Sequence, residues 1–309
     1  MGFGLRAAGN DGHWGPVTST LDWCEENYVI TPWIAEFWNS TSNIFYVLTM
    51  IFGLQTAKAI GVTEWRTYLS MYSITAVGLG SFLFHASLWF ETQMMDELPM
   101  IYCCSVFVFA CLRVFPETNK NNTLLAVGLA AYCIAVTAIY LYLKNPVFHE
   151  VSYAILAAIL FITPPIQYYH IKNNYKQYAK RVPGLWKLYW FGAVSYLGGF
   201  AIWGIDNNFC EEVRATRAYL GFPLSIFFQL HMFWHLGTAI GTYASILGIT
   251  YTRQLALGRD DIYLHWIAGI MPTLKTDLNQ KQLAQKLKKK KNVEFSNKRH
   301  LLNRESFHH

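Results

Sequence analysis

Two histidines four residues apart, His231 and His235, form the most distinctive chemical pattern in this chain. On a helix this spacing places both imidazoles on one face, where a single metal ion can bind both. A second pair with the same spacing, Ser81 and His85, lies in an earlier apolar stretch. A third histidine from another helix completes the open three-ligand arrangement of a hydrolytic zinc site. The spacing therefore predicts zinc ligation by His85, His231 and His235.

Two further polar residues near His85 suggest what such a site does. Zinc lowers the pKa of a bound water from 15.7 toward about 7, which supplies a nucleophile at neutral pH. Asp96 begins the next apolar stretch, a short turn beyond His85, and is expected to act as the general base and acid. Ser81 is expected to donate a hydrogen bond to a developing oxyanion.

Other uses of these histidines are weighed against the zinc site. A single histidine inside a membrane helix usually makes an interhelical hydrogen bond instead of binding a metal. Haem ligation generally uses histidines that face each other from separate helices. Six other histidines are assigned no role because they lie at a span end or in loops and tail, at positions 149, 170, 265, 300, 308 and 309.

The composition indicates that the elements around this site lie in a membrane. The chain of 309 residues is 53% hydrophobic and 14% charged, and its mean hydropathy is +0.20. Soluble domains average roughly 25% charged residues. Disordered, coiled-coil and collagen-like chains are excluded. No secretory signal peptide is expected in residues 1–28, which lack a long enough apolar core.

Seven stretches approach the length of about 20 apolar residues that a membrane helix needs. The fold class expected is therefore all-α integral membrane, a seven-transmembrane helix bundle with an intramembrane metal site. Residues 1–36 form an amino-terminal segment, 37–250 the seven-transmembrane catalytic domain, and 251–309 a basic tail that is largely disordered. The expected spans are 37–57, 68–90, 95–114, 123–143, 148–169, 186–206 and 220–250.

The basic residues indicate how the chain is oriented. On the side of the amino terminus lie only Arg6, Lys144, Arg214 and Arg217, and the other Lys and Arg residues, of 25 in all, lie on the opposite side. The positive-inside rule then predicts a lumenal or extracellular amino terminus and a cytosolic tail. The basic run Lys288–Lys291 is more typical of a topology determinant or a lipid contact than of nucleic-acid binding. The acidic residues gather on the lumenal side, where a divalent cation is plausible.

Several blocks of the chain together resemble one family. The chain resembles the alkaline ceramidases, seven-span hydrolases of the larger superfamily that includes the adiponectin and progestin receptors. The resemblance covers about residues 12–255. The blocks that carry it are Trp14–Tyr28, Ile34–Asn39, Gly80–His85, Asp96–Met100, Asp206–Cys210 and His231–His235.

The resemblance implies both a reaction and a second metal site. The reaction is hydrolysis of the ceramide amide bond to a free fatty acid and a sphingoid base, with the same zinc ligands and catalytic residues that the spacing predicts. The reverse condensation is also possible. Calcium takes six to eight oxygen ligands, which the amino-terminal block can supply. The implied calcium ligands are Asp22, Trp23 through its backbone carbonyl, Glu25, Asn27 and Glu36.

The cysteines fit a protein of the secretory pathway. Cys24 and Cys210 both fall on the predicted lumenal side, where an oxidising compartment favours a disulfide between them, and the family pattern supports this pair. The other four cysteines lie within spans and are expected to be buried apolar residues. The expected location is the membrane of the endoplasmic reticulum or Golgi.

The expected partners are a ceramide-type lipid and the bilayer, with no nucleic acid and no obligate protein partner. The ceramide subtype, including phytoceramide and dihydroceramide, stays open. Two other functions are considered: a seven-transmembrane receptor of the adiponectin or progestin receptor type, because a fold does not fix function, and a haem or ion-conducting membrane protein.

Overall fold

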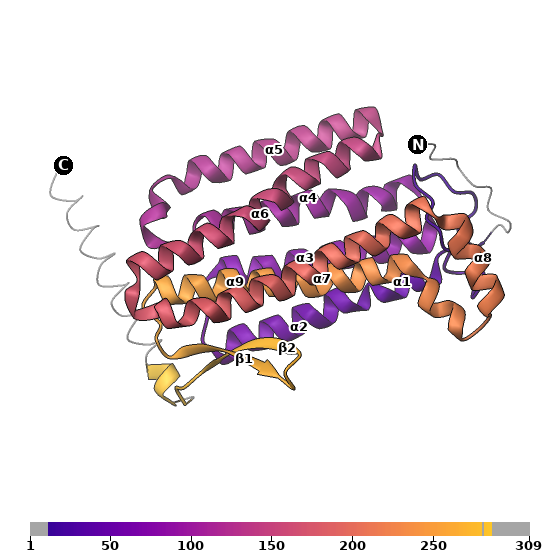
Figure 1. The fold of residues 1–309 in the computed structure, drawn as a ribbon. Helices are drawn as coiled ribbons and strands as arrows, with labels where there is room; N and C mark the ends of the chain where they lie inside the picture. Colours follow the sequence, from indigo (N-terminus) through magenta and orange to yellow (C-terminus); the bar gives the residue numbers. More distant parts are fainter. Residues whose placement is uncertain (1–11, 280, 286–309) are drawn as a thin grey trace.

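The long helices run side by side in an elongated bundle (Figure 1). The computed structural model describes residues 12–279 and 281–285. Two strands near the carboxyl end form an antiparallel hairpin. The elements in chain order are α1 (Phe37–Ser42), α2 (Ile44–Ala59), α3 (Trp65–Ser87), α4 (Phe90–Leu112), η1 (Pro116–Asn121), α5 (Asn122–Leu143), α6 (Pro146–Asn174), η2 (Lys176–Arg181), α7 (Val182–Asn208), α8 (Cys210–Leu220), η3 (Leu224–Phe228), α9 (Leu230–Ala256), β1 (Ile262–Ile267) and β2 (Met271–Thr276).

Five helical segments of the described chain are long and apolar enough to cross a membrane: α3, α4, α5, α6 and the segment Lys176–Asn208 that joins η2 to α7. The expectation of an all-α membrane protein is therefore confirmed at this level. The first expected span, 37–57, is instead divided at Asn43 into the short α1 and the 16-residue α2. The Asn43 amide donates hydrogen bonds to the carbonyls of Asn39 and Ser40, which ends α1 at this point.

Helices α7 and α9 approach closely because glycines line their contact. A side chain on Gly199 would meet the Cα atom of Gly237 at 3.3 Å, and one on Gly241 would meet the Gly192 carbonyl oxygen at 3.0 Å. Small residues let membrane helices pack backbone to backbone, where dispersion contacts replace the missing hydrophobic drive. This packing sets the position of α9, which carries His231 and His235.

The segment that precedes α1 covers the carboxyl end of α3. The last turn of a helix has carbonyl groups without intrahelical partners. Here the carbonyl of His85 accepts the N–H of Glu36 at 2.9 Å, and the carbonyl of Ala86 accepts the N–H of Ala35 at 2.9 Å. Leu88, in a left-handed conformation with φ of 54°, ends the helix and is completely buried. The amino-terminal segment is therefore built onto α3.

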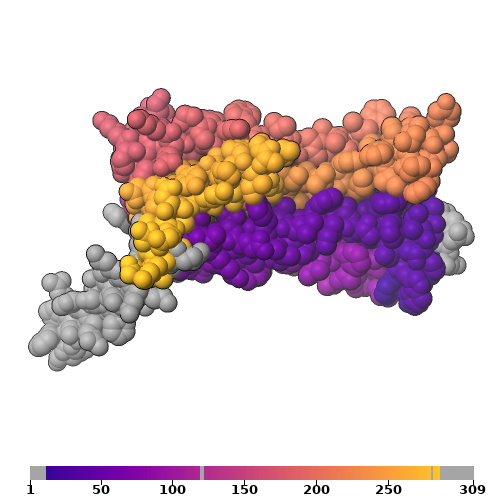
Figure 2. All heavy atoms as spheres, turned by 90° about the horizontal axis from the view of Figure 1, so that it is seen from below, coloured from indigo at the N-terminus to yellow at the C-terminus, as the bar shows by residue number. Residues whose placement is uncertain are grey.

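The carboxyl end of the bundle differs from the expected disordered tail. Helix α9 continues to Ala256, and β1 and β2 follow it, so the expectation of disorder is wrong for residues 251–276. A turn with positive φ at Ala268 and Gly269 joins the two strands. Most of the basic part of the tail, residues 286–309, lies outside the described residues. Figure 2 shows the hairpin, in yellow-orange, lying lengthwise on the bundle between its amino-terminal and carboxyl-terminal helices.

Candidate active site and metal centre

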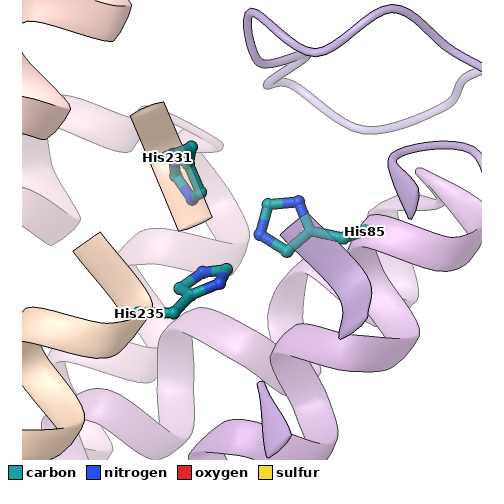
Figure 3. A group of neighbouring side chains, drawn as sticks. All are labelled: His85, His231 and His235. Carbon is teal, nitrogen blue, oxygen red and sulfur yellow. The ribbon is translucent and has the colours of Figure 1, made fainter. Parts of the chain in front are cut away.

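Three buried histidines converge between α3 and α9. One ligand nitrogen from each of His85, His231 and His235 lies within 4.8 Å of the other two, and each residue is no more than 3% exposed. The imidazoles point toward a common centre (Figure 3). Within the described part of the chain, no other three His, Cys, Asp or Glu side chains bring one ligand atom each this close together. The structure therefore assembles the three histidines that the spacing predicts as ligands.

Polar neighbours orient two of these imidazoles. The Nδ1 atom of His85 is paired with the Glu36 carboxylate, and Nδ1 of His235 lies 2.8 Å from the Ser42 hydroxyl. In both residues Nε2 is left as the nitrogen that can face a metal. Metal-binding histidines nearly always use their second nitrogen in this way, because the outer partner fixes the ring orientation and the tautomer.

His231 is held by packing instead. Its ring lies against the indole of Trp23, with centroids 4.6 Å apart, and its buried Nδ1 atom has no hydrogen-bond partner among the described residues. A buried nitrogen without a partner carries a desolvation cost that a bound metal ion would remove. The donor set and this unpaired nitrogen both fit zinc. Three imidazoles around one point also differ from the opposed pair typical of haem.

Ser81 and Asp96 lie beside the histidine cluster. The Ser81 hydroxyl is 3.5 Å from Nε2 of His235, and Ser81 and Asp96 line the same cavity. Asp96 is brought there by an unusually close contact between α3 and α4. A side chain on Gly80 would overlap the carbonyl oxygen of Met95 and lie 3.1 Å from the backbone nitrogen of Asp96. Proline at position 99 leaves that carbonyl without its usual intrahelical donor, so it is available to face α3.

A large apolar cavity opens beside these residues. Its volume is about 550 Å³, and its wall includes Ser81, Asp96, His231 and His235. Most of the remaining lining is aliphatic or aromatic and comes from α3, α4, α6, α7 and α9. Such a cavity suits a ligand with long apolar chains and a polar group near its reacting end.

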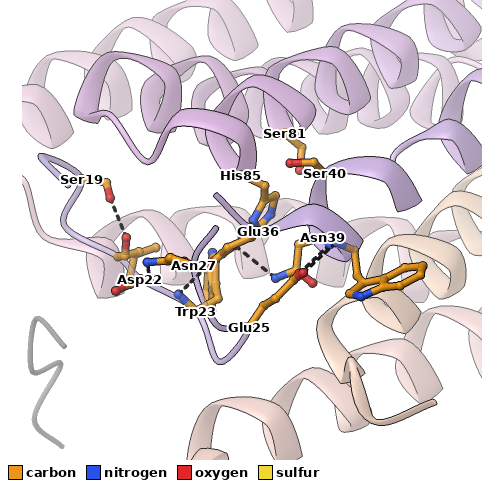
Figure 4. Close-up of polar contacts among 12 residues, drawn as sticks. Ser19, Asp22, Trp23, Glu25, Asn27, Glu36, Asn39, Ser40, Ser81 and His85 are labelled. Carbon is orange, nitrogen blue, oxygen red and sulfur yellow. Dashed lines mark hydrogen bonds and ion pairs between the residues drawn. The ribbon is translucent and has the colours of Figure 1, made fainter. Parts of the chain in front are cut away.

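The residues expected to bind calcium lie close to the histidines (Figure 4). Both carboxylate oxygens of Glu25 accept backbone N–H groups of α1, from Trp38 at 2.7 Å and Asn39 at 2.8 Å. Glu36 accepts the Trp23 N–H at 3.0 Å and the Asn39 amide at 3.1 Å. These carboxylates thus form a network through N–H donors, and they do not converge as the histidines do.

The electrostatics of this segment favour a cation. Burial and the neighbouring Glu36 carboxylate raise the pKa of Glu25 to about 8, and burial raises the pKa of Glu36 to about 7. The Asn27 amide donates to Asp22 at 3.2 Å, and its own buried carbonyl oxygen lacks a partner among the described residues. Two buried carboxylates and an unpaired amide oxygen form an oxygen donor set that fits calcium.

The expected disulfide between Cys24 and Cys210 is confirmed, and it fixes the segment to α8. Two arginines of α8 strengthen this attachment: the Cys24 carbonyl accepts hydrogen bonds from Arg217 at 2.6 Å and Arg214 at 2.8 Å. Arg217 also lies 3.0 Å from the carboxylate of Glu26. Helix α8 therefore holds the acidic segment in place beside the histidines.

Four of these contributions were not predicted from the sequence: Ser42 as the partner of His235, Glu36 as the partner of His85, Gly80 as a contact point of α3 and α4, and Arg217 as a support for Cys24. The polar residues Glu36, Asn39 and Ser42 recur at every third position and so share one face of a short helix, which is a signal that was available. The others depend on contacts between distant segments.

Comparison with known proteins identifies the family. The family model described as Ceramidase matches residues 15–275. The chain is 39% identical to alkaline ceramidase 3 of Mus musculus over 269 residues, which cover 87% of this chain and 96% of the mouse protein. It is 31% identical to alkaline ceramidase YPC1 of Saccharomyces cerevisiae over 258 residues, 80% of each chain. It is also 27% identical to the alkaline ceramidase of Arabidopsis thaliana over 271 residues, 88% of this chain and 98% of the plant protein. This chain belongs to the ceramidase family.

Proposed function

We propose that this protein is a zinc-dependent alkaline ceramidase, which hydrolyses the amide bond of ceramide to a sphingoid base and a free fatty acid. The observation that carries the proposal is the buried group of three histidines, with Ser81 and Asp96 beside it, at the wall of an apolar cavity. The family relationship supports the substrate class.

The proposed architecture has seven spans. In addition to the five membrane-length segments, α1 with α2 would form the first span and α9 the last. The amino-terminal segment and α8 lie at one end of the bundle, and the hairpin begins at the other (Figure 1). By the positive-inside rule the first end is lumenal and the second cytosolic. The disulfide supports this orientation, because such bonds persist in oxidising compartments such as the lumen of the endoplasmic reticulum or Golgi.

The chemistry is divided between the metal and the side chains. Zinc held by His85, His231 and His235 would supply Lewis acidity to the amide carbonyl and acidify water at neutral pH. Asp96 accepts the proton of the attacking water and later delivers it to the leaving amine, as the C–O bond forms and the C–N bond breaks. Ser81 donates a hydrogen bond to the oxygen on which negative charge develops.

The cavity holds the two hydrocarbon chains and keeps bulk water from the reacting centre. Its apolar lining suits a substrate that enters laterally from the bilayer. Since the same residues can act in the opposite direction, condensation of a fatty acid with a sphingoid base is an expected reverse reaction in a fatty-acid-rich membrane.

The proposed second metal is calcium, bound by Asp22, the Trp23 carbonyl, Glu25, Asn27 and Glu36. The two buried carboxylates with raised pKa values support this site. Since Glu36 is also paired with His85, calcium at this site would regulate catalysis by fixing the carboxylate that orients a zinc ligand.

The experiment that tests the proposal is a hydrolysis panel on purified protein. Phytoceramide, dihydroceramide and unsaturated ceramide are supplied in mixed micelles, with and without a zinc chelator and across a range of calcium concentrations. We expect fatty acid release that the chelator abolishes and added zinc restores. A properly folded, zinc-loaded protein that releases no fatty acid from any ceramide would contradict the proposal and favour a receptor function.

A further inference from the structure

The strands β1 and β2 belong to an apolar stretch with unusual properties. Between Asp261 and Lys275 the chain has no Asp, Glu, Lys or Arg residue, and the seven residues 266–272 are all apolar or glycine. This uncharged and mostly apolar stretch of 13 residues, Ile262–Leu274, is too short to span a bilayer, and stretches of 10–14 apolar residues are typical of a re-entrant or interfacial segment. The antiparallel pairing of Ile262–Ile267 with Met271–Thr276 folds this stretch back on itself.

The hairpin is seated along the membrane-length helices and does not project from the end of the bundle. The ring of Trp266 packs edge-on against Phe191, with centroids 5.3 Å apart, within the apolar segment Lys176–Asn208. The Tyr243 hydroxyl donates to the Pro272 carbonyl at 2.8 Å. Tyr243 lies midway along α9, roughly 20 Å from its last residue at 1.5 Å per residue. The tip of the hairpin is therefore far from the helix end at which the hairpin begins (Figures 1 and 2).

The hairpin backbone is paired between its two strands, and β2 is in contact with the bundle. Irregular or extended backbone is tolerated at membrane depth only where protein satisfies its polar groups. Pro272, Thr273 and Leu274 of β2 are buried against the bundle, where the Thr273 hydroxyl lies 2.9 Å from that of Thr56 in α2. The N–H of Ile270 closes the turn by donating to the Ile267 carbonyl at 3.0 Å.

The two isoleucines of the tip are exposed, whereas Met271 packs against the core of the bundle. Ile270 is 72% exposed and Ile267 is 43% exposed. The Lys187 ammonium lies 4.4 Å from the centroid of the Trp266 ring, a pair of residues that is common where hydrocarbon meets headgroups. From Trp266 the hairpin continues toward its tip, away from Lys275 near its base.

We propose that the β1–β2 hairpin is a re-entrant membrane element, whose tip, Ile267–Met271, contacts lipid acyl chains in the leaflet at the carboxyl end of α9. The hairpin packs against the outer surface of α2, α7 and α9. Its two exposed isoleucines, Ile267 and Ile270, contact lipid instead of water. The bilayer itself is the partner of this surface, and neither metal site is involved.

Nitroxide accessibility in nanodiscs tests this proposal without any measurement of catalysis. Ile270→Cys is spin-labelled, and the collision rates of the label with oxygen, which concentrates in lipid, and with a water-soluble nickel chelate are compared. The lipid-exposed reference is Ile134→Cys on α5, where Ile134 is 70% exposed within a membrane-length helix. The aqueous reference is Asp277→Cys, an exposed position just after β2. Protein without an added cysteine gives the labelling background.

We expect the label at position 270 to match the one at 134, with collisions with oxygen several-fold more frequent than collisions with nickel. A label that matches position 277 would overturn the proposal. Ile267→Cys gives a second reading at the same depth if the first variant does not fold, and a water-accessible label there would also overturn it.

Discussion

Replacing Gly80 with alanine tests whether the close contact of α3 with α4 positions Asp96 for catalysis. The new methyl group would overlap the carbonyl oxygen of Met95 and lie 3.1 Å from the Asp96 nitrogen. Carbon–oxygen contacts between helices are normally about 3.3–3.6 Å even when they are favourable. The first turns of α4 must therefore move away from α3 by a distance on the order of 1 Å.

The expected effect is on the chemical step. A displacement of about 1 Å at a catalytic group costs roughly 10²-fold in rate, or about 2.7 kcal/mol of transition-state stabilisation. We expect kcat for ceramide hydrolysis to fall by about this factor and KM to change little, because the cavity wall is retained. Overpacking of this kind also destabilises a fold by about 1–3 kcal/mol. Zinc content should be unchanged, since α9 and His85 stay in place.

The assay measures initial rates of fatty acid release over a range of ceramide concentrations, together with zinc content by elemental analysis and the melting temperature. Gly128→Ala on α5 is the matched control, because a side chain there would meet no atom within 4 Å. Its activity should equal that of the unsubstituted protein. If Gly80→Ala kept full kcat, the contact between α3 and α4 would not be needed to position Asp96, and the reasoning would fail.

Three further outcomes are expected. Glu36→Gln should lower zinc affinity by about 10–100-fold, because the charged partner of His85 is lost. The affinity is measured by titrating zinc into metal-free protein and following the recovery of activity. An unchanged affinity would argue against a role of Glu36 in orienting His85. Without calcium, the raised pKa values of Glu25 and Glu36 mean that the folded state holds more protons than the unfolded one, so stability falls as pH rises from about 4.5 toward 8. Calcium should therefore raise the melting temperature more at pH 8 than at pH 6, and equal shifts would contradict a calcium site at these carboxylates. The double change Cys24→Ser and Cys210→Ser should lower the free energy of unfolding by about 2–4 kcal/mol. The melting temperature of this variant is compared with those of the unsubstituted protein before and after reduction. If the disulfide causes the loss, the variant melts below the oxidised protein and at the same temperature as the reduced protein.

The histidine cluster could be predicted from the sequence because two constraints coincide there. An ionisable residue in a membrane segment is costly, so few are present, and the four-residue spacing of His231 and His235 leaves one shared face. The third ligand, His85, was predictable because few other intramembrane histidines compete for the position. Scarcity and periodicity are local properties of the chain, and both are visible without a structure.

The features that were missed have a different origin. The break at Asn43 depends on whether its amide bonds to its own helix, which composition does not reveal. The hairpin lies in the segment 251–309, for which the basic run Lys288–Lys291 and its polar flanks predict disorder. Its stability comes from contacts with Phe191 and Tyr243, which lie far away in sequence. Gly80 is informative only once Met95 is known to lie opposite, because a glycine within a helix has no single meaning from sequence.

The amino-terminal segment and the histidine cluster form one hydrogen-bonded unit. Glu36 donates its backbone N–H to the His85 carbonyl. Its Oε2 atom is paired with the His85 imidazole, and its Oε1 atom accepts the N–H of Trp23. Ordering such a segment costs about 1–2 kcal/mol per residue in backbone entropy. Packing of Leu21, Tyr28 and Ala35 with Phe84 and Leu88 offsets part of this cost. The cost is offset where the segment caps α3 and where α8 holds it through Cys210 and Arg217. Removing the segment would leave α3 with unpaired carbonyls and His85 without its orienting carboxylate. Residues 12–36 therefore form one packed unit with α3 and α8, and we expect a chain that lacks them to lose metal affinity at the histidine cluster.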